Sequence, residues 1–171
     1  LLSLSRDQVM GLAGRGVEAA LLCGETPREE ESDVYSRLRS SGGGGVRLLY
    51  VTPEKIVKSK KLMSVLESLS GRGSLRRVVI DEAHCCSTMG HDFRPDYAKL
   101  FVLKRQFPGV PILAVTATAT AEVEREVKRV LLGDGGRWET FRGSFDRPNI
   151  TYAIQKKADT GAAFKKQLLA A

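Results

Sequence analysis

The chain has 171 residues, enough to bury one hydrophobic core, and its 42% hydrophobic and 27% charged residues are ordinary for a globular protein. Its 27 Lys and Arg outnumber 20 Asp and Glu, and the resulting charge of +7 favours a polyanionic partner such as nucleic acid, with a solvated basic surface as the alternative. Three cysteines, two of them adjacent, argue against a disulfide framework and indicate a reducing compartment, and no apolar run approaches the roughly 18 residues of a membrane span.

Helical patterns alternate with short apolar runs along most of the chain. In chain order we expect a helix at 4–14, a strand at 16–22, a helix at 27–40, a strand at 46–51, a helix at 54–69, a strand at 75–80, a helix at 96–107, a strand at 110–115 and a helix at 119–132. Several strands are apolar on both faces, as in a parallel sheet that helices cover on both sides. The alternation predicts an α/β fold with a doubly wound parallel sheet.

The densest chemistry lies in "DEAHCCSTMGHDFRPDY", residues 81–97, which holds both histidines and two of the three cysteines. A zinc site needs about four ligands at tetrahedral reach, and adjacent cysteines project poorly toward one ion. A Cys–His nucleophile pair needs a base placed in space, which spacing alone does not provide. The side chains that these two interpretations would use are His84, Cys85, Cys86 and His91.

A third interpretation fits the predicted architecture better. The strand at 75–80 ends in Asp81 and Glu82, and ligands of open α/β sheets bind at the carboxyl ends of the strands. Asp81 would hold Mg²⁺ through water, because magnesium takes carboxylate and phosphate oxygens. Glu82 would polarise the water that attacks a γ-phosphate. Two solvated acids at a helix start are the structural alternative, but they would leave the threonines of "VTATAT" unexplained.

These residues carry a family resemblance. The motif "DEAH" (81–84) resembles the Walker B motif of superfamily 2 helicases, and "CCSTMGHDFRPDY" (85–97) resembles the aromatic-rich loop of RecQ helicases. The neighbouring segments are similar to the family's motifs Ia, Ib and III and to the segment that leads toward the second lobe, in this order: "SLSRDQV" (3–9), "YVTPEK" (50–55), "VTATAT" (115–120) and "FDRPNITY" (145–152). The match is best with the shorter eukaryotic members.

The resemblance implies a RecA-like doubly wound sheet over residues 1–144, as an incomplete first helicase lobe, and a connector toward a second lobe over 145–171. It implies ATP and Mg²⁺ as cofactors, single-stranded and duplex DNA as partners, 3′-to-5′ unwinding in DNA repair and recombination, and a nuclear location. A nucleic-acid-binding remnant without motor activity is the alternative function.

The resemblance also assigns roles to single residues. His84 would sense the nucleotide state, and Thr116 and Thr118 would couple hydrolysis to strand movement. The residues expected to contact single-stranded DNA are Arg6 and Gln8 in motif Ia, Thr52, Pro53 and Glu54 in motif Ib, and His91, Phe93 and Arg94 in the aromatic-rich loop.

The chain departs from the family pattern in three places. It has no Gly-x-x-x-x-Gly-Lys-Ser/Thr, so we expect the phosphate-binding loop upstream of Leu1. The second lobe, with its arginine finger and a zinc-bearing region, is expected beyond Ala171. Thr88 and Met89 stand where the family usually has Gln and Trp. A lone lobe without the phosphate-binding lysine should bind ATP poorly and should not unwind DNA.

Overall fold

The computed structural model describes residues 2–40, 45–89, 92–133, 136–144, 146–151 and 154. The chain separates into two compact units, Leu1–Trp138 and Glu139–Ala171. Among the described residues, all helices and strands belong to the first unit, and none of these helices is long and apolar enough to cross a bilayer. The division predicted at residues 144 and 145 stays a prediction.

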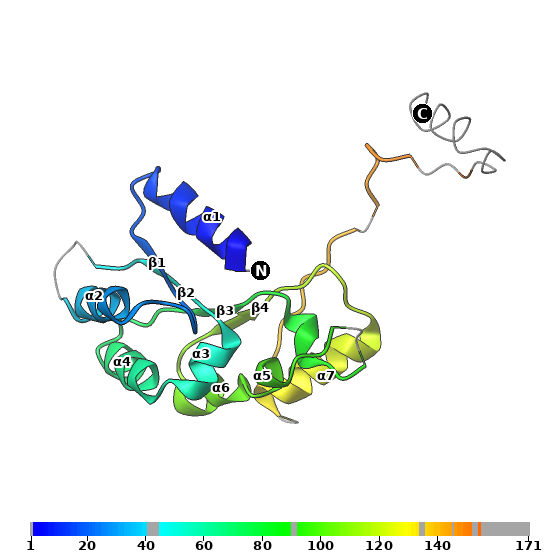
Figure 1. Cartoon of the computed structure of the whole chain (residues 1–171). Helices are drawn as coiled ribbons and strands as arrows, with labels where there is room; N and C mark the ends of the chain where they lie inside the picture. The colour runs from blue at the N-terminus through cyan, green and yellow to red at the C-terminus, as the bar shows by residue number, and fades with distance from the viewer. Residues whose placement is uncertain are drawn as a thin grey trace, which may run out of the picture. The chain divides into compact units, whose positions relative to one another are not determined.

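Helices and strands alternate in the first unit nearly as predicted (Figure 1). The order is α1 (Leu2–Ala13), β1 (Ala19–Leu22), α2 (Arg28–Arg39), β2 (Leu48–Val51), α3 (Pro53–Lys58), α4 (Lys60–Gly71), β3 (Val78–Ile80), the 3₁₀ helix η1 (Ala83–Cys86), α5 (Pro95–Ala98), α6 (Phe101–Gln106), β4 (Ile112–Ala114) and α7 (Ala121–Leu132).

The helix predicted at 54–69 is wrong in one respect, because it is divided at Ser59 into α3 and α4. Ser59 has extended backbone angles, and its amide donates to the carbonyl of Lys55 to end α3. Its hydroxyl accepts from the Leu62 amide at 3.2 Å and so caps α4. The helix predicted at 96–107 is likewise divided, into α5 and α6, around Lys99 and Leu100.

The strands are parallel and form two pairs. In one pair Ala19 of β1 lies opposite Leu48 of β2, and in the other Val78 of β3 lies opposite Ile112 of β4. The predicted α/β class with parallel strands is confirmed. Among the described residues the four strands make two two-stranded sheets. These sheets form part of the doubly wound sheet that the sequence predicts.

Helices lie on both sides of the strands, with α1 on one side and α2, α3 and α4 on the other (Figure 1). The core lies on the side of α2 and α4, and its largest fully buried apolar side chains are Tyr35, Leu22, Leu62 and Leu131. The other face of β3 and β4 is open to solvent. Val79 and Leu113, cross-strand neighbours on these strands, are 57% and 45% exposed.

A polar cluster fastens α2 to α3 at the edge of this core. The Tyr35 hydroxyl donates to Glu31 at 2.7 Å, and the Lys55 ammonium lies 3.1 Å from the same carboxylate. The Lys61 ammonium lies 4.7 Å from the centre of the Tyr35 ring, a cation–π distance. The hydrogen bond from Tyr35, followed by that from Lys55, lowers the pKa of Glu31, so this carboxylate is ionised at neutral pH.

Candidate functional site

The carboxyl ends of β3 and β4 bring the segment after Ile80 beside the segment after Ala114. The Val115 amide donates to the Ile80 carbonyl at 2.9 Å, and the Ala83 amide donates to the Val115 carbonyl at 2.9 Å. Backbone pairing therefore continues past the last residues of both strands. These hydrogen bonds hold the two segments that follow β3 and β4 in a fixed register.

The chain turns sharply at Glu82, which has φ 51° and ψ 42°, the left-handed region. Among the described residues Glu82 alone combines a side chain with a positive φ. A non-glycine residue there costs about 1–2 kcal/mol. The Asp81 carboxylate accepts from the Glu82 amide at 2.9 Å and stabilises the turn. A strained backbone conformation persists only where the surrounding structure imposes it, and such residues are concentrated at functional sites.

His84 is the link between the two segments. Its Nδ1 lies 2.8 Å from the Thr116 hydroxyl and 3.2 Å from a Glu82 carboxylate oxygen. Its Nε2 lies 3.9 Å from the Asp92 carboxylate, and only 15% of its side chain is exposed. The Nδ1 atom therefore faces both an acid from the β3 end and a hydroxyl from the β4 end.

The two predicted coupling threonines differ in their contacts. The Thr116 hydroxyl accepts from the Thr118 amide at 3.2 Å and lies 3.4 Å from the Thr118 carbonyl, in addition to its contact with His84. Thr118 contributes its backbone to this turn, and the residue is exposed. Thr116 is therefore the side chain of the pair that contacts the DEAH segment.

The thiols of Cys85 and Cys86 are buried and do not have the properties that a nucleophile needs. Burial raises the pKa of Cys86 to about 12, and burial also raises the pKa of Cys85. Both thiols are therefore protonated at neutral pH, whereas a nucleophilic cysteine is a thiolate. No three His, Cys, Asp or Glu side chains gather to hold a metal ion within the described part of the chain, and His91 lies outside it.

A cavity of about 1490 Å³ reaches from β2 and α3 to the end of β3. It gathers residues that are far apart in the sequence, from the first helix to Val115 after β4. The predicted site residues in its lining are Gln8, Thr52, Pro53, Glu54, Asp81, Glu82 and Arg94. The carboxylates at the β3 end and most of the predicted DNA contacts thus line the same cavity.

In the motif Ia and Ib segments, some predicted DNA contacts have structural partners. Arg6 is exposed and lies 3.4 Å from the exposed Glu25 carboxylate, a pair that contributes little to stability. The Thr52 hydroxyl accepts from the Lys55 amide at 3.4 Å, and Pro53 occupies the first position of α3. Thr52 and Pro53 therefore start this helix, and their contact with DNA stays a prediction.

The aromatic-rich loop returns to η1 at Arg94, whose amide donates to the Cys85 carbonyl at 3.0 Å. Phe93 is 39% exposed, and Arg94 is exposed at the rim of the cavity. Neither side chain is a core residue, so both are accessible to a partner.

Glu126 was not predicted from the sequence. Its carboxylate accepts from the Ser87 hydroxyl, from the Thr88 hydroxyl at 2.7 Å and from the Met89 amide at 3.3 Å. These bonds, that from Ser87 first, lower its pKa to about 2. A signal exists in the sequence, because Glu126 occupies a position in the apolar stripe of α7 that includes Val123 and Val127.

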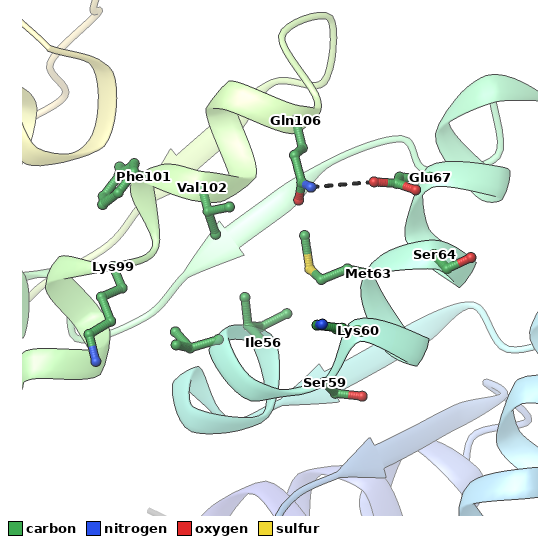
Figure 2. A pocket seen from close by; sticks show the side chains of 11 residues that line it. Ile56, Ser59, Lys60, Met63, Ser64, Glu67, Lys99, Phe101, Val102 and Gln106 are labelled. Atoms are coloured by element: carbon green, nitrogen blue, oxygen red, sulfur yellow. Dashed lines mark hydrogen bonds between the residues drawn. The ribbon is translucent and has the colours of Figure 1, made fainter.

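A second pocket, of about 470 Å³, lies between α3, α4 and α6 (Figure 2). Ile56, Met63 and Val102 face one another in it, and the Gln106 amide donates to Glu67 at 3.3 Å across its upper rim. None of the predicted site residues lines this pocket. Its lining therefore adds nothing to the site at the strand ends.

The family model of the DEAD/DEAH box helicases matches residues 3–126, well over half of the chain. The chain belongs to the DEAD/DEAH box helicase family. The matched range holds α1 to the middle of α7, and with them every predicted catalytic and coupling residue. The fold described above is accordingly a partial RecA-like α/β fold.

Curated relatives of this DEAD/DEAH box helicase chain carry RecQ-type names. "ATP-dependent DNA helicase Q-like 2" of Arabidopsis thaliana is 47% identical over 161 residues, 94% of this chain and 22% of the relative. "ATP-dependent DNA helicase Q1" of Mus musculus is 41% identical over 99% of this chain and 26% of the relative. "RecQ-like DNA helicase BLM" of Xenopus laevis is 42% identical over 92% of this chain and 11% of the relative. The RecQ resemblance is confirmed, and the chain spans about a quarter or less of these relatives.

Proposed function

We propose that this chain is part of an ATP-dependent DNA helicase that moves 3′ to 5′ along single-stranded DNA and unwinds duplexes in nuclear repair and recombination. The single observation that carries the proposal is the 2.8 Å contact between His84 and Thr116. It joins a carboxylate segment suited to nucleotide hydrolysis to a second segment that leads away into α7. A site that only bound nucleic acid would not need this junction.

ATP would be the substrate at the carboxyl end of β3. Glu82 lies at a strained turn with a carboxylate that can orient a water molecule for attack on the γ-phosphate. Asp81 is exposed at the strand end, and one such carboxylate fits a hydrated Mg²⁺, which takes one or two carboxylates together with water and phosphate oxygens. When bound, the ion would neutralise phosphate charge.

The relay would run through His84. Its Nδ1 is within 3.2 Å of both the Glu82 carboxylate and the Thr116 hydroxyl, so it can bond only one of them well at a time with its single hydrogen. A change in the charge that faces Glu82 would shift this balance. The hydroxyl of Thr116 would pass the change to the turn at Thr118.

Single-stranded DNA would run along the rim of the cavity that holds Gln8, Glu54 and Arg94. Arg94 can reach a phosphate, and the exposed Phe93 ring can stack on a base. His91 would assist in the same loop. Contacts of this kind position the strand without reading its sequence. A second helicase lobe would complete the motor in the full-length protein.

The test is Glu82→Gln in the full-length gene product. We expect ATP hydrolysis to fall by about two orders of magnitude or more, because the water-orienting carboxylate is lost. Nucleotide binding, measured by fluorescence titration, should change little. Glu122→Gln, an equal change of charge at the exposed start of α7, is the matched control and should keep the wild-type rate.

Two results would contradict the proposal. Loss of nucleotide binding together with turnover would make Glu82 a structural residue. A wild-type protein that binds DNA and hydrolyses no ATP would favour the non-motor alternative.

A further inference from the structure

Glu126 holds three successive residues of the loop that follows the DEAH segment. The donors are the hydroxyls of Ser87 and Thr88 and the amide of Met89. Ser87 has no exposed surface, and its hydroxyl also accepts from the Met89 amide at 3.2 Å. An ionised carboxylate that accepts several hydrogen bonds is a strong and geometrically specific anchor.

This anchor is a second side-chain connection between the same pair of segments, in addition to the backbone hydrogen bonds at the strand ends. The first joins His84 to Thr116 at the strand ends. The second joins residues 87–89 to Glu126, ten residues further along from Thr116. Between them the chain enters α7, which the Thr120 hydroxyl caps by accepting from the Val123 amide at 3.3 Å. The two segments are thus joined at both ends, by His84 and Thr116 at the strand ends and by residues 87–89 and Glu126 in α7.

We propose that Glu126 is a positioning residue that fixes Ser87–Met89 to α7, so that DNA held at Phe93 and Arg94 is reported to Thr116 through the helix. The coupling role rests on the proposed function, whereas the anchoring itself does not. Without the second fastening, a displacement of the aromatic-rich loop would pass to the threonine segment by way of η1, whose Cys85 carbonyl accepts from the Arg94 amide. With it, the same displacement pulls on the helix that begins directly after the threonine segment.

The anchor also assigns a use to Thr88, which replaces the Gln usual in the family. Its hydroxyl donates to Glu126 at 2.7 Å, while the neighbouring Met89 side chain is 72% exposed and adds its backbone amide alone to the anchor. A short side chain at this position fits a carboxylate that approaches so closely. The departure from the family pattern is therefore part of the connection to α7.

The anchoring is tested by amide hydrogen exchange in the 171-residue chain. Glu126→Gln and Glu126→Ala should speed exchange at the Met89 amide by about tenfold or more, because a charge-assisted anchor is lost. Exchange at Val127 and Leu131 should stay as in the wild type and report that α7 is intact. Glu124→Gln removes the same charge from the same helix, where its partner is Lys128, and should leave Met89 unchanged. Unchanged exchange at Met89 in Glu126→Ala would overturn the anchor.

The coupling role is tested in the full-length gene product, as the ratio of DNA-stimulated to basal ATP hydrolysis. Glu126→Gln should lower this ratio severalfold while the Kd for single-stranded DNA changes little, and Glu124→Gln should keep the ratio. Thr88→Val removes the hydroxyl and keeps the shape. It should lower the ratio less than Glu126→Gln does, and the double variant should be no worse than Glu126→Gln alone, since the two residues act as a unit.

The outcomes separate the two proposals. An unchanged ratio in Glu126→Gln, or losses that simply add in the double variant, would overturn the coupling role and leave the helicase function standing. A wild-type protein without DNA-stimulated hydrolysis would overturn the helicase function and with it the coupling role, while the exchange experiment would still decide the anchor.

Discussion

Glu82 and Glu126 are held in place by different local interactions. Glu82 is held in a left-handed backbone conformation, in which its amide donates to Asp81 and its carboxylate lies beside His84. Glu126 is held by hydrogen-bond donors that its own helix does not supply. For Glu82 the sequence motif pointed to the function, and the structure added the strain. For Glu126 the contacts came from the structure alone.

Glu126 should make the stability of the chain depend on acid pH. Its pKa in the folded protein, about 2, lies below the ordinary value of 4.5. The carboxylate therefore stabilises the fold fully above about pH 4.5, and this contribution is lost as pH falls toward 2. We expect the difference in unfolding free energy between wild type and Glu126→Gln to be constant from pH 7 to 5 and to shrink below that. Urea titrations across this range measure it. A difference as large at pH 2.5 as at pH 7 would mean that the charge of Glu126 is irrelevant to the anchor.

At the scale of elements, the capping residue Ser59 divided what the apolar pattern predicted as one helix. The pattern of apolar residues continues through α3 and α4, and it carries no information on the backbone angles between them. One serine serves both helices, since its amide ends the first and its hydroxyl starts the second. The same helix, α3, begins at Thr52 and Pro53 and so presents the motif Ib residues at the cavity.

Ser59→Ala should destabilise the chain by about 1 kcal/mol, the usual value for an N-cap. Ser64→Ala, on the exposed side of α4, is the matched control and should be neutral or slightly stabilising, because alanine has the higher helix propensity. Thermal and urea unfolding of both variants provide the comparison. Equal stability of the two variants would show that the hydroxyl of Ser59 does not cap α4.

The whole molecule combines an excess of positive charge with a large cavity that collects residues from most of its elements. The charge of +7 follows from composition, and we propose that it acts on a polyanion at the cavity rim. Arg94 belongs to this rim, whereas Arg105 of α6 does not. Both arginines are exposed to solvent, so they differ in their position relative to the cavity.

We expect weak binding of single-stranded DNA without sequence preference, with an affinity that falls linearly with salt on a log–log plot because counterions are released. Arg94→Gln should lower the slope by about 0.7, the value for one phosphate contact on a single strand. Arg105→Gln removes an equal charge away from the cavity and should keep the slope. Fluorescence anisotropy at several salt concentrations gives both numbers. Equal slopes for the two variants would mean that the basic excess acts only as a diffuse field.

The sequence by itself determined the α/β class, the order of the elements and the family. Alternating apolar periods predict strands and helices because burial requires them, and the motifs lie at the strand ends because parallel strands place their carboxyl ends together. Only the tertiary structure decided which side chains meet. The contacts of His84 with Thr116 and of Glu126 with Thr88 join residues more than thirty positions apart. Such pairings depend on the register of β3 against β4 and on the rotation of α7, and neither quantity is encoded in a local pattern of hydrophobic residues.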